Sequence, residues 1–218
     1  MALAIFDLDH TLLDGDSDYL WGEYMVANQI VDKSEYQRVN KAFLRDYQRG
    51  QLDNHSYLHF ALKPLSQHSI EKLYKWRADY VENWIKPIIA TGTSELLQQH
   101  RTRGDTLIII SATNLFITEP IAELLGITHI LSTKPEIIDQ RYTGRYLGIP
   151  TYKEGKVVVL KAWLEDRDYT LDDSYFYSDS INDLPLLEQV SIPVAVNPDD
   201  DLRHIAEQRN WEILDLRC

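Results

Sequence analysis

Short apolar runs recur along this chain of 218 residues, and they are the clearest feature of its hydrophobic pattern. Runs that are too short for a helix and lack polar alternation are typical of strands buried on both faces of a parallel sheet. We expect such strands in the run from Ala4 to Asp7 and in five further segments: Leu107–Ile110, Ile130–Leu131, Tyr175–Tyr177, Ile192–Val196 and Ile213–Leu214.

Helical segments lie between several of these runs. Ser94–Arg103 and Phe116–Leu125 are each followed by a glycine, which is a common signal for a helix C-terminus, and Lys156–Leu164 forms a third segment. Residues 133–148 carry turn signals and predict a hairpin-like excursion. The alternation of helices and strands predicts an α/β fold with a doubly wound, mainly parallel sheet.

Residues 17–85 follow another pattern, with helical spacing and almost no strand-like runs. Two apolar stripes repeat at helical intervals: Tyr36, Val39, Phe43 and Tyr47, then Ile70, Leu73, Trp76, Tyr80, Val81 and Trp84. We therefore expect residues 1–16 and 86–218 to form an α/β core domain. Residues 17–85 are expected to form a small helical cap, inserted after the first strand and covering the active face.

Composition narrows the range of partners and locations. A net charge of -12 disfavours binding to nucleic acid or to anionic membranes, because the electrostatic contribution would be repulsive. No apolar run approaches a membrane span, and Asp7 follows the first residue too closely for a signal peptide. The single cysteine, Cys218, excludes an intrachain disulfide, so we expect a cytoplasmic protein.

Acidic residues follow two of the predicted strands. Asp7 and Asp9 come directly after the first, and Asp179 and Asp183 follow the run Tyr175–Tyr177. Residues i and i+2 on a strand point to the same side, so Asp7 and Asp9 are expected to share a side. Asp-x-Asp-x-Thr alone is also found in turns with solvated acids. Two acid clusters at strand ends favour a Mg²⁺ site for phosphoryl transfer, because the cation relieves carboxylate repulsion.

Four motifs occur in a familiar order: Asp7-Leu8-Asp9-His10-Thr11, Ser111 after an apolar run, Lys156, and Asp179 with Asp183. From Ile5 to about Val196 the chain resembles the haloacid dehalogenase (HAD) superfamily of hydrolases. The resemblance is to subfamily IB, whose members are phosphoserine-phosphatase-like and histidinol-phosphatase-like. It implies a Rossmann-like core with a helical cap that closes over a small phosphomonoester.

The resemblance also implies roles for the motif residues. Asp7 corresponds to the nucleophile that forms an aspartyl-phosphate, and Asp9 to the general acid and base. Mg²⁺ is expected to bind a carboxylate oxygen of Asp7, the backbone carbonyl of Asp9 and a carboxylate oxygen of Asp179. Lys156 would neutralise Asp7 and the phosphate.

Two further groups of residues have competing interpretations. Ser111, Ala112 and Thr11 correspond to phosphate-binding positions, although a serine or threonine after a strand is also a common turn residue. Asp183 is expected either to orient metal-bound water or Lys156, or to cap the helix that begins at the next residue.

The substrate is less clearly indicated. Phosphoserine phosphatases carry a glutamate nine residues after the nucleophile, where it meets the substrate amine, and this chain has the shorter Asp16. No cap arginine is clearly placed to bind a substrate carboxylate, and Arg45 and Arg49 are only candidates. The departures favour an amino-alcohol phosphate such as histidinol phosphate, with phosphoserine as the alternative.

Other classes of protein share parts of this pattern. A dehalogenase would need no leaving-group acid at Asp9, and a phospho-acceptor signalling module would lack the helical insert. A binding protein without turnover would not need polar residues at every motif.

Overall fold

The protein is described here by a computed structural model that covers residues 2–217, so Cys218 lies outside the described residues. Its main sheet has six strands in the order β3-β2-β1-β6-β7-β8, and every neighbouring pair is parallel. The strands are β1 (Leu3–Phe6), β2 (Thr106–Ser111), β3 (His129–Ser132), β6 (Tyr175–Ser178), β7 (Ile192–Val196) and β8 (Glu212–Leu214). Each of the six apolar runs therefore contributes a strand, as predicted.

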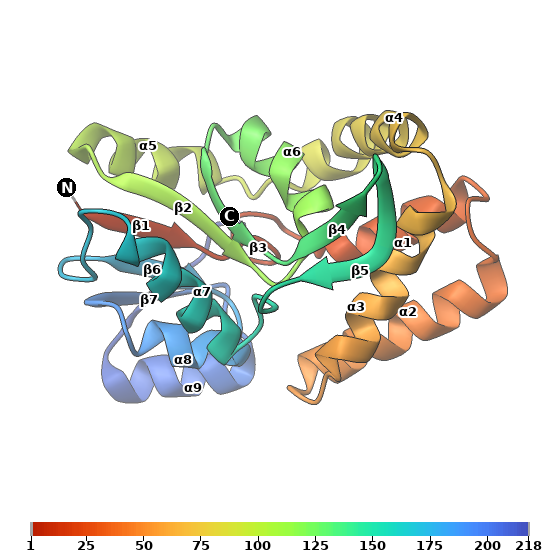
Figure 1. The fold of residues 1–218 in the computed structure, drawn as a ribbon. Helices are drawn as coiled ribbons and strands as arrows, with labels where there is room; N and C mark the ends of the chain where they lie inside the picture. Colours follow the sequence, from red (N-terminus) through yellow and green to blue (C-terminus); the bar gives the residue numbers. More distant parts are fainter. Residues whose placement is uncertain (1, 218) are drawn as a thin grey trace.

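Helices cover both faces of this sheet (Figure 1). One face carries α5 (Thr93–Arg103) and α6 (Leu115–Leu125), and the other carries α7 (Glu154–Glu165), α8 (Leu184–Leu187) and α9 (Asp200–Arg209). Side chains of β1 alternate between the two layers: Ala4 and Phe6 join one core, and Leu3 and Ile5 join the other. Since both faces are buried, the strand has no polar position, and the doubly wound α/β prediction is confirmed.

The segment between β1 and α5 is helical, as its spacing predicted. It contains α1 (Ser17–Ala27), α2 (Lys33–Gln48), α3 (Asn54–Leu62) and α4 (Ile70–Tyr80). A 3₁₀ turn at Lys63–Gln67 (η1) precedes α4, and a π-helical turn at Val81–Ile85 (η2) and a 3₁₀ turn at Lys86–Ile88 (η3) follow it.

The two ends of this helical segment meet at the sheet. The Tyr80 hydroxyl donates to the Ser17 carbonyl at 2.6 Å, and Leu13 forms an isolated antiparallel bridge with Ile89. Such an insertion leaves the sheet and returns to it at one place, as a cap would require. The division into core and cap stays a prediction.

A hairpin of β4 (Lys134–Ile138) and β5 (Arg141–Leu147) forms a separate two-stranded antiparallel sheet, in agreement with the turn signals of residues 133–148. It reaches from the main sheet toward the helical segment and packs on α3 and η1 (Figure 1). The hairpin therefore supports the helices from the side of the core.

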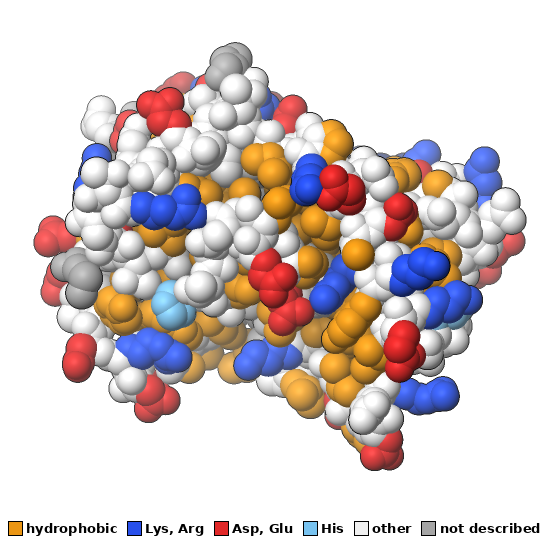
Figure 2. Space-filling view, turned by 90° about the horizontal axis from the view of Figure 1, so that it is seen from above, with side chains coloured by type: hydrophobic (Ala, Val, Ile, Leu, Met, Phe, Trp, Pro, Cys, Tyr) orange, Lys and Arg blue, Asp and Glu red, His pale blue; other side chains and the backbone are white. Residues whose placement is uncertain are grey.

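Surface charge is mixed on the face seen from above. Acidic and basic side chains are scattered there, and hydrophobic side chains gather near the middle of this face (Figure 2). Within residues 2–217, no helix has both the length and the apolar character needed to cross a bilayer.

Candidate active site

The predicted site residues gather at the carboxyl ends of three adjacent strands, β2, β1 and β6. Asp7 follows β1, Asp179 follows β6, and Ser111 is the last residue of β2. From β2 the chain continues to β3 on one side, whereas from β6 it continues to β7 on the other. A reversal of this kind leaves a crevice at the strand ends, where open α/β sheets bind their ligands.

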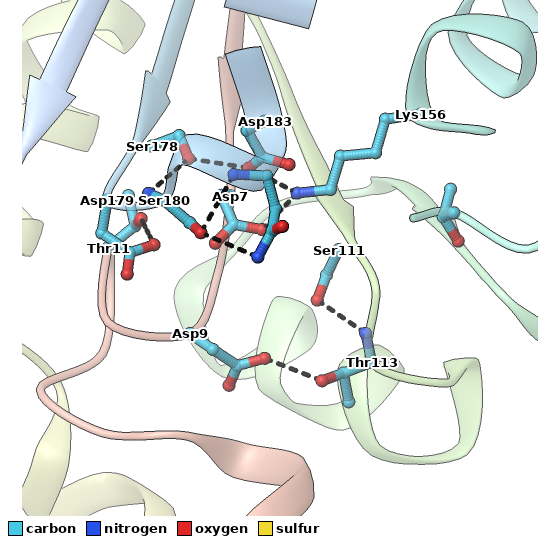
Figure 3. A network of polar contacts seen from close by, with 12 residues as sticks. Asp7, Asp9, Thr11, Ser111, Thr113, Lys156, Ser178, Asp179, Ser180 and Asp183 are labelled. Atoms are coloured by element: carbon cyan, nitrogen blue, oxygen red, sulfur yellow. Dashed lines mark hydrogen bonds and ion pairs between the residues drawn. The ribbon is translucent and has the colours of Figure 1, made fainter. Parts of the chain in front are cut away.

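Lys156 lies between two carboxylates (Figure 3). Its Nζ is 2.7 Å from Asp7 Oδ1 and 2.7 Å from Asp183 Oδ2, and all three side chains are buried. The Ser178 hydroxyl also donates to Asp183 Oδ2, at 2.7 Å. The Asp183 side chain makes no capping hydrogen bond to α8, so the geometry favours the first of its two interpretations.

The start of α7 determines where Lys156 lies. A Cβ at Gly155 would be only 2.0 Å from the carbonyl oxygen of Pro150, so the helix approaches this loop more closely than any other residue would allow. Lys153, just before the helix, donates instead to the Gly50 carbonyl at 2.8 Å, and Lys161 is exposed. Of the three lysines in this region, the structure brings Lys156 to Asp7.

The buried carboxylates outnumber the buried cation. Burial raises the pKa of Asp7 to about 7; Lys156 opposes the rise, whereas Asp183 and Asp9 add to it. Burial also raises the pKa of Asp179 well above its usual range, together with Asp7 and Asp183. Burial alone would lower the pKa of Lys156, but Asp183 and Asp7 raise it. A divalent cation would relieve this excess of negative charge.

The donor atoms fit Mg²⁺, which prefers oxygen ligands and keeps several waters. Across the described part of the chain, no three His, Cys, Asp or Glu side chains come together as a metal-binding cluster. The predicted ligand set needs only two side chains, Asp7 and Asp179, with the Asp9 backbone carbonyl as the third ligand. Thr11 donates to Asp179 Oδ1 at 3.2 Å, so its hydroxyl holds one of these carboxylates (Figure 3).

Asp9 is held by hydrogen bonds to both carboxylate oxygens. Oδ1 accepts from the Ser17 backbone N–H at 2.6 Å, and Oδ2 accepts from the Thr113 hydroxyl at 2.7 Å. A hydroxyl that donates to a carboxylate can turn and accept from the protonated acid, so Thr113 suits a group that gains and loses a proton. The Thr113 backbone N–H donates to Ser111 Oγ at 3.1 Å, which leaves the Ser111 hydroxyl proton free to donate.

A partly enclosed cavity adjoins these groups. Ser111, Ala112 and Thr113 form part of its wall. Its other lining groups include four aspartates and four aromatic residues: Asp7, Asp9, Asp16, Asp18, Tyr19, Phe43, Tyr47 and Tyr57. No lysine or arginine is among the described residues that line it, and both Arg45 and Arg49 are exposed.

Asp16 lies on the cavity wall and also begins α1. Its Oδ1 accepts from the backbone N–H groups of Asp18 at 3.0 Å and Tyr19 at 2.8 Å, which is an N-cap. Burial raises the pKa of Asp16 to about 6, and the Asp9 carboxylate adds to the rise. One oxygen of the Asp16 carboxylate therefore holds the helix. The contact of Asp16 with substrate stays a prediction.

Three polar residues of this region were not assigned a role from the sequence: Thr113, Ser178 and Asp18. Thr113 and Ser178 lie at the ends of β2 and β6. Their sequence signal is that each is a hydroxyl residue close to a motif residue. Asp18 gave no such signal, because an acid in the first turn of a helix usually serves the helix itself.

Comparison with known proteins gives a family match over most of the chain. The sequence model of the haloacid dehalogenase-like hydrolase family matches residues 4–188. A histidinol-phosphatase of Neisseria meningitidis serogroup C is 45% identical over 99% of both chains. A crystal structure of a protein of unknown function from Bordetella pertussis superposes with a TM-score of 0.92 at 42% identity, covering 99% of this chain and 98% of that one.

A phosphoserine phosphatase structure, described as a phospho-aspartyl intermediate analogue, shares the fold with a TM-score of 0.70. Its identity is 19%, and the match covers 98% of this chain and 92% of the other.

Proposed function

Because this chain belongs to the haloacid dehalogenase-like hydrolases and is a phosphatase, we propose that it hydrolyses a small cationic phosphomonoester, histidinol phosphate, through phosphorylated Asp7 and with Mg²⁺. One observation carries the substrate proposal. The cavity beside Asp7 is lined by acidic and aromatic groups and by no described basic residue.

In the first step, a carboxylate oxygen of Asp7 attacks phosphorus and the bond from phosphorus to the ester oxygen breaks. Lys156, 2.7 Å from Asp7 Oδ1, favours the ionised nucleophile. The leaving oxygen takes its proton from Asp9, and the Thr113 hydroxyl orients that acid.

In the second step, water attacks the phosphorus of phosphorylated Asp7. Asp9 accepts the proton of that water, and the bond from phosphorus to the Asp7 oxygen breaks, so phosphate leaves and both acids return to their first state. Ser111 and the backbone at Ala112 would bind the phosphate oxygens, whereas Thr11 would act through its hydrogen bond to Asp179. Mg²⁺, held by Asp7, Asp179 and the Asp9 carbonyl, would supply positive charge opposite the transferring phosphoryl group.

The choice between the two substrates depends on the group that each carries beside its phosphate. Phosphoserine has a carboxylate, which would face Asp16 and Asp18 without a described cation on the cavity wall. Histidinol phosphate has an amine and an imidazole and no carboxylate, so it suits an acidic and aromatic wall. The 45% identity to a protein named histidinol-phosphatase supports the same choice.

The test is phosphate release from histidinol phosphate, phosphoserine and 4-nitrophenyl phosphate, each with Mg²⁺ and with excess chelator. We expect kcat/KM for histidinol phosphate to exceed that for phosphoserine by about tenfold or more, as expected for an unpaired buried charge. Equal or faster turnover of phosphoserine would contradict the substrate, and undiminished turnover in chelator would contradict the metal. Asp7→Asn should abolish both turnover and any trapped phospho-enzyme.

A further inference from the structure

Asp18 is a buried acid that takes no part in either of the two reaction steps. It lies in the first turn of α1 and lines the cavity, with only 8% of its surface exposed. Its Oδ1 accepts from Asn114 Nδ2 at 3.4 Å, whereas Oδ2 is buried and has no hydrogen-bond partner. A buried carboxylate oxygen without a partner is costly, so a group that binds there would bring a clear gain.

The surroundings of Asp18 favour a positively charged partner. Burial raises the pKa of Asp18 to about 8, and the carboxylates of Asp16 and Asp9 add to the rise. The nearby Tyr57 hydroxyl opposes the rise. A cation in the cavity would favour the ionised acid and form a charge-assisted hydrogen bond with it.

Aromatic rings complete this part of the wall. Phe43 and Tyr57 line the same cavity, and their ring centroids are 5.4 Å apart in an edge-to-face arrangement. Aromatic faces attract organic cations, and the attraction is stronger where water is excluded. An acid beside two aromatic rings is a suitable site for an ammonium or imidazolium group.

Asp16 is less available than Asp18 for this contact. Two backbone N–H groups that cap α1 already occupy Asp16 Oδ1, so only Oδ2 of this residue is left for a ligand. Asp18 loses no helix contact when its Oδ2 binds a ligand.

We propose that Asp18, with the rings of Phe43 and Tyr57, binds the cationic nitrogen of the substrate's organic group and so sets specificity for positively charged phosphomonoesters. This inference rests on the proposed function and deepens it, because it assigns the preference for an organic cation to one residue. Asp18 is a specificity residue here and takes no part in the chemistry at phosphorus.

The experiment compares kcat/KM of Asp18→Asn and wild type for histidinol phosphate and for 4-nitrophenyl phosphate, whose organic group is uncharged and which is called the neutral ester here. We expect a loss of about 10- to 100-fold for histidinol phosphate, mainly in KM, because a hydrogen bond to a charged group is lost. The neutral ester should change less than threefold. Asp16→Asn, which retains a good N-cap residue, should cause a smaller selective loss. Glu35→Gln, on the exposed side of α2, is the charge-matched control.

A second measurement uses histidinol itself, which carries the cation but no phosphate. Histidinol should inhibit wild type competitively, and Asp18→Asn should weaken this inhibition by a similar factor. If Asp18→Asn does not fold, Phe43→Leu serves instead and should also lower turnover of histidinol phosphate more than that of the neutral ester.

The outcomes separate the two proposals. Equal losses for both esters in the variants would overturn the role of Asp18 and leave the proposed function standing. If wild type fails to turn over histidinol phosphate while it hydrolyses the neutral ester, the proposed substrate is wrong and the role of Asp18 falls with it.

Discussion

Removing the charge of Lys156 should destabilise the fold in a way that depends on pH. In Lys156→Met the side chain keeps a similar length, and two ion pairs of 2.7 Å are lost. The side chains of Lys156, Asp7 and Asp183 are only 2%, 6% and 2% exposed, so the two carboxylates would remain buried without their cation. Breaking a buried pair from one side costs about 3–5 kcal/mol, a large part of a typical stability of about 5–15 kcal/mol.

The pH dependence follows from Asp7. Its pKa is already raised from 3.8 to about 7 although Lys156 opposes the rise, so the variant should raise it further. An acid whose pKa is higher in the folded state stabilises the fold below its unfolded pKa, and this contribution is lost as pH rises through the folded value. The free energy of unfolding that Lys156→Met loses relative to wild type should therefore be greatest near pH 8.5. This loss should shrink toward pH 6, where Asp7 can take a proton.

The assay is urea unfolding at pH 6, 7 and 8.5 in the presence of chelator, so that no cation replaces the lysine. Lys161→Met, an exposed lysine on the same helix, is the control and should stay within about 0.5 kcal/mol of wild type. If the two variants unfold at the same urea concentration at pH 8.5, the buried triad does not have the electrostatic role assigned to it. A deficit that grows as pH falls would contradict the assignment to Asp7.

Two further variants test the surroundings of the site. Gly155→Ala should lower the free energy of unfolding by about 1–3 kcal/mol and also reduce kcat, because a Cβ 2.0 Å from the Pro150 carbonyl must displace the start of α7 and with it Lys156; Val158→Ala, on the exposed side of that helix, should change neither quantity appreciably. Thr113→Val should lower kcat for an alkyl phosphate by about 10- to 100-fold with little change in KM, because Asp9 Oδ2 loses its partner. A kcat close to that of wild type would show that Thr113 does not orient the acid.

The strands were predictable because nothing polar interrupts them. All four residues of β1 are buried, two in each core layer, and the same apolar pattern marks β2 and β7. Helix ends were predictable where glycine supplies a left-handed backbone: α5 and α6 are followed by Gly104 and Gly126 at φ of 77° and 67°. These are local properties, and a sequence displays them directly.

The placement of the motif acids was predictable, but one reason given for it does not apply. β1 ends at Phe6, so strand alternation does not govern Asp7 and Asp9. Asp7 pairs with Lys156, whereas Asp9 pairs with Thr113 and Ser17. The two acids serve the site from different directions because the chain turns after the strand.

Lys156 needed the resemblance, because a lysine near a helix start is usually solvated. Its position depends on Gly155 and on the loop at Pro150, and neither residue carries a charge that would reveal a site. The close approach of helix and loop that brings the amine to Asp7 exists only in three dimensions.

The hydrophobic stripe of α2 and the acids of α1 show where sequence patterns stop being informative about function. Helical spacing marked Phe43 and Tyr47 as buried residues, and spacing alone does not distinguish a core from a cavity wall. Both line the cavity. Asp16 and Asp18 likewise both look like acids that favour a helix N-terminus, and motif spacing points to Asp16. The difference between them is that the helix backbone bonds to Asp16, whereas a buried oxygen of Asp18 has no partner. Oδ1 of Asp16 holds two N–H groups, whereas Oδ2 of Asp18 is buried with none, and only a folded chain reveals that difference.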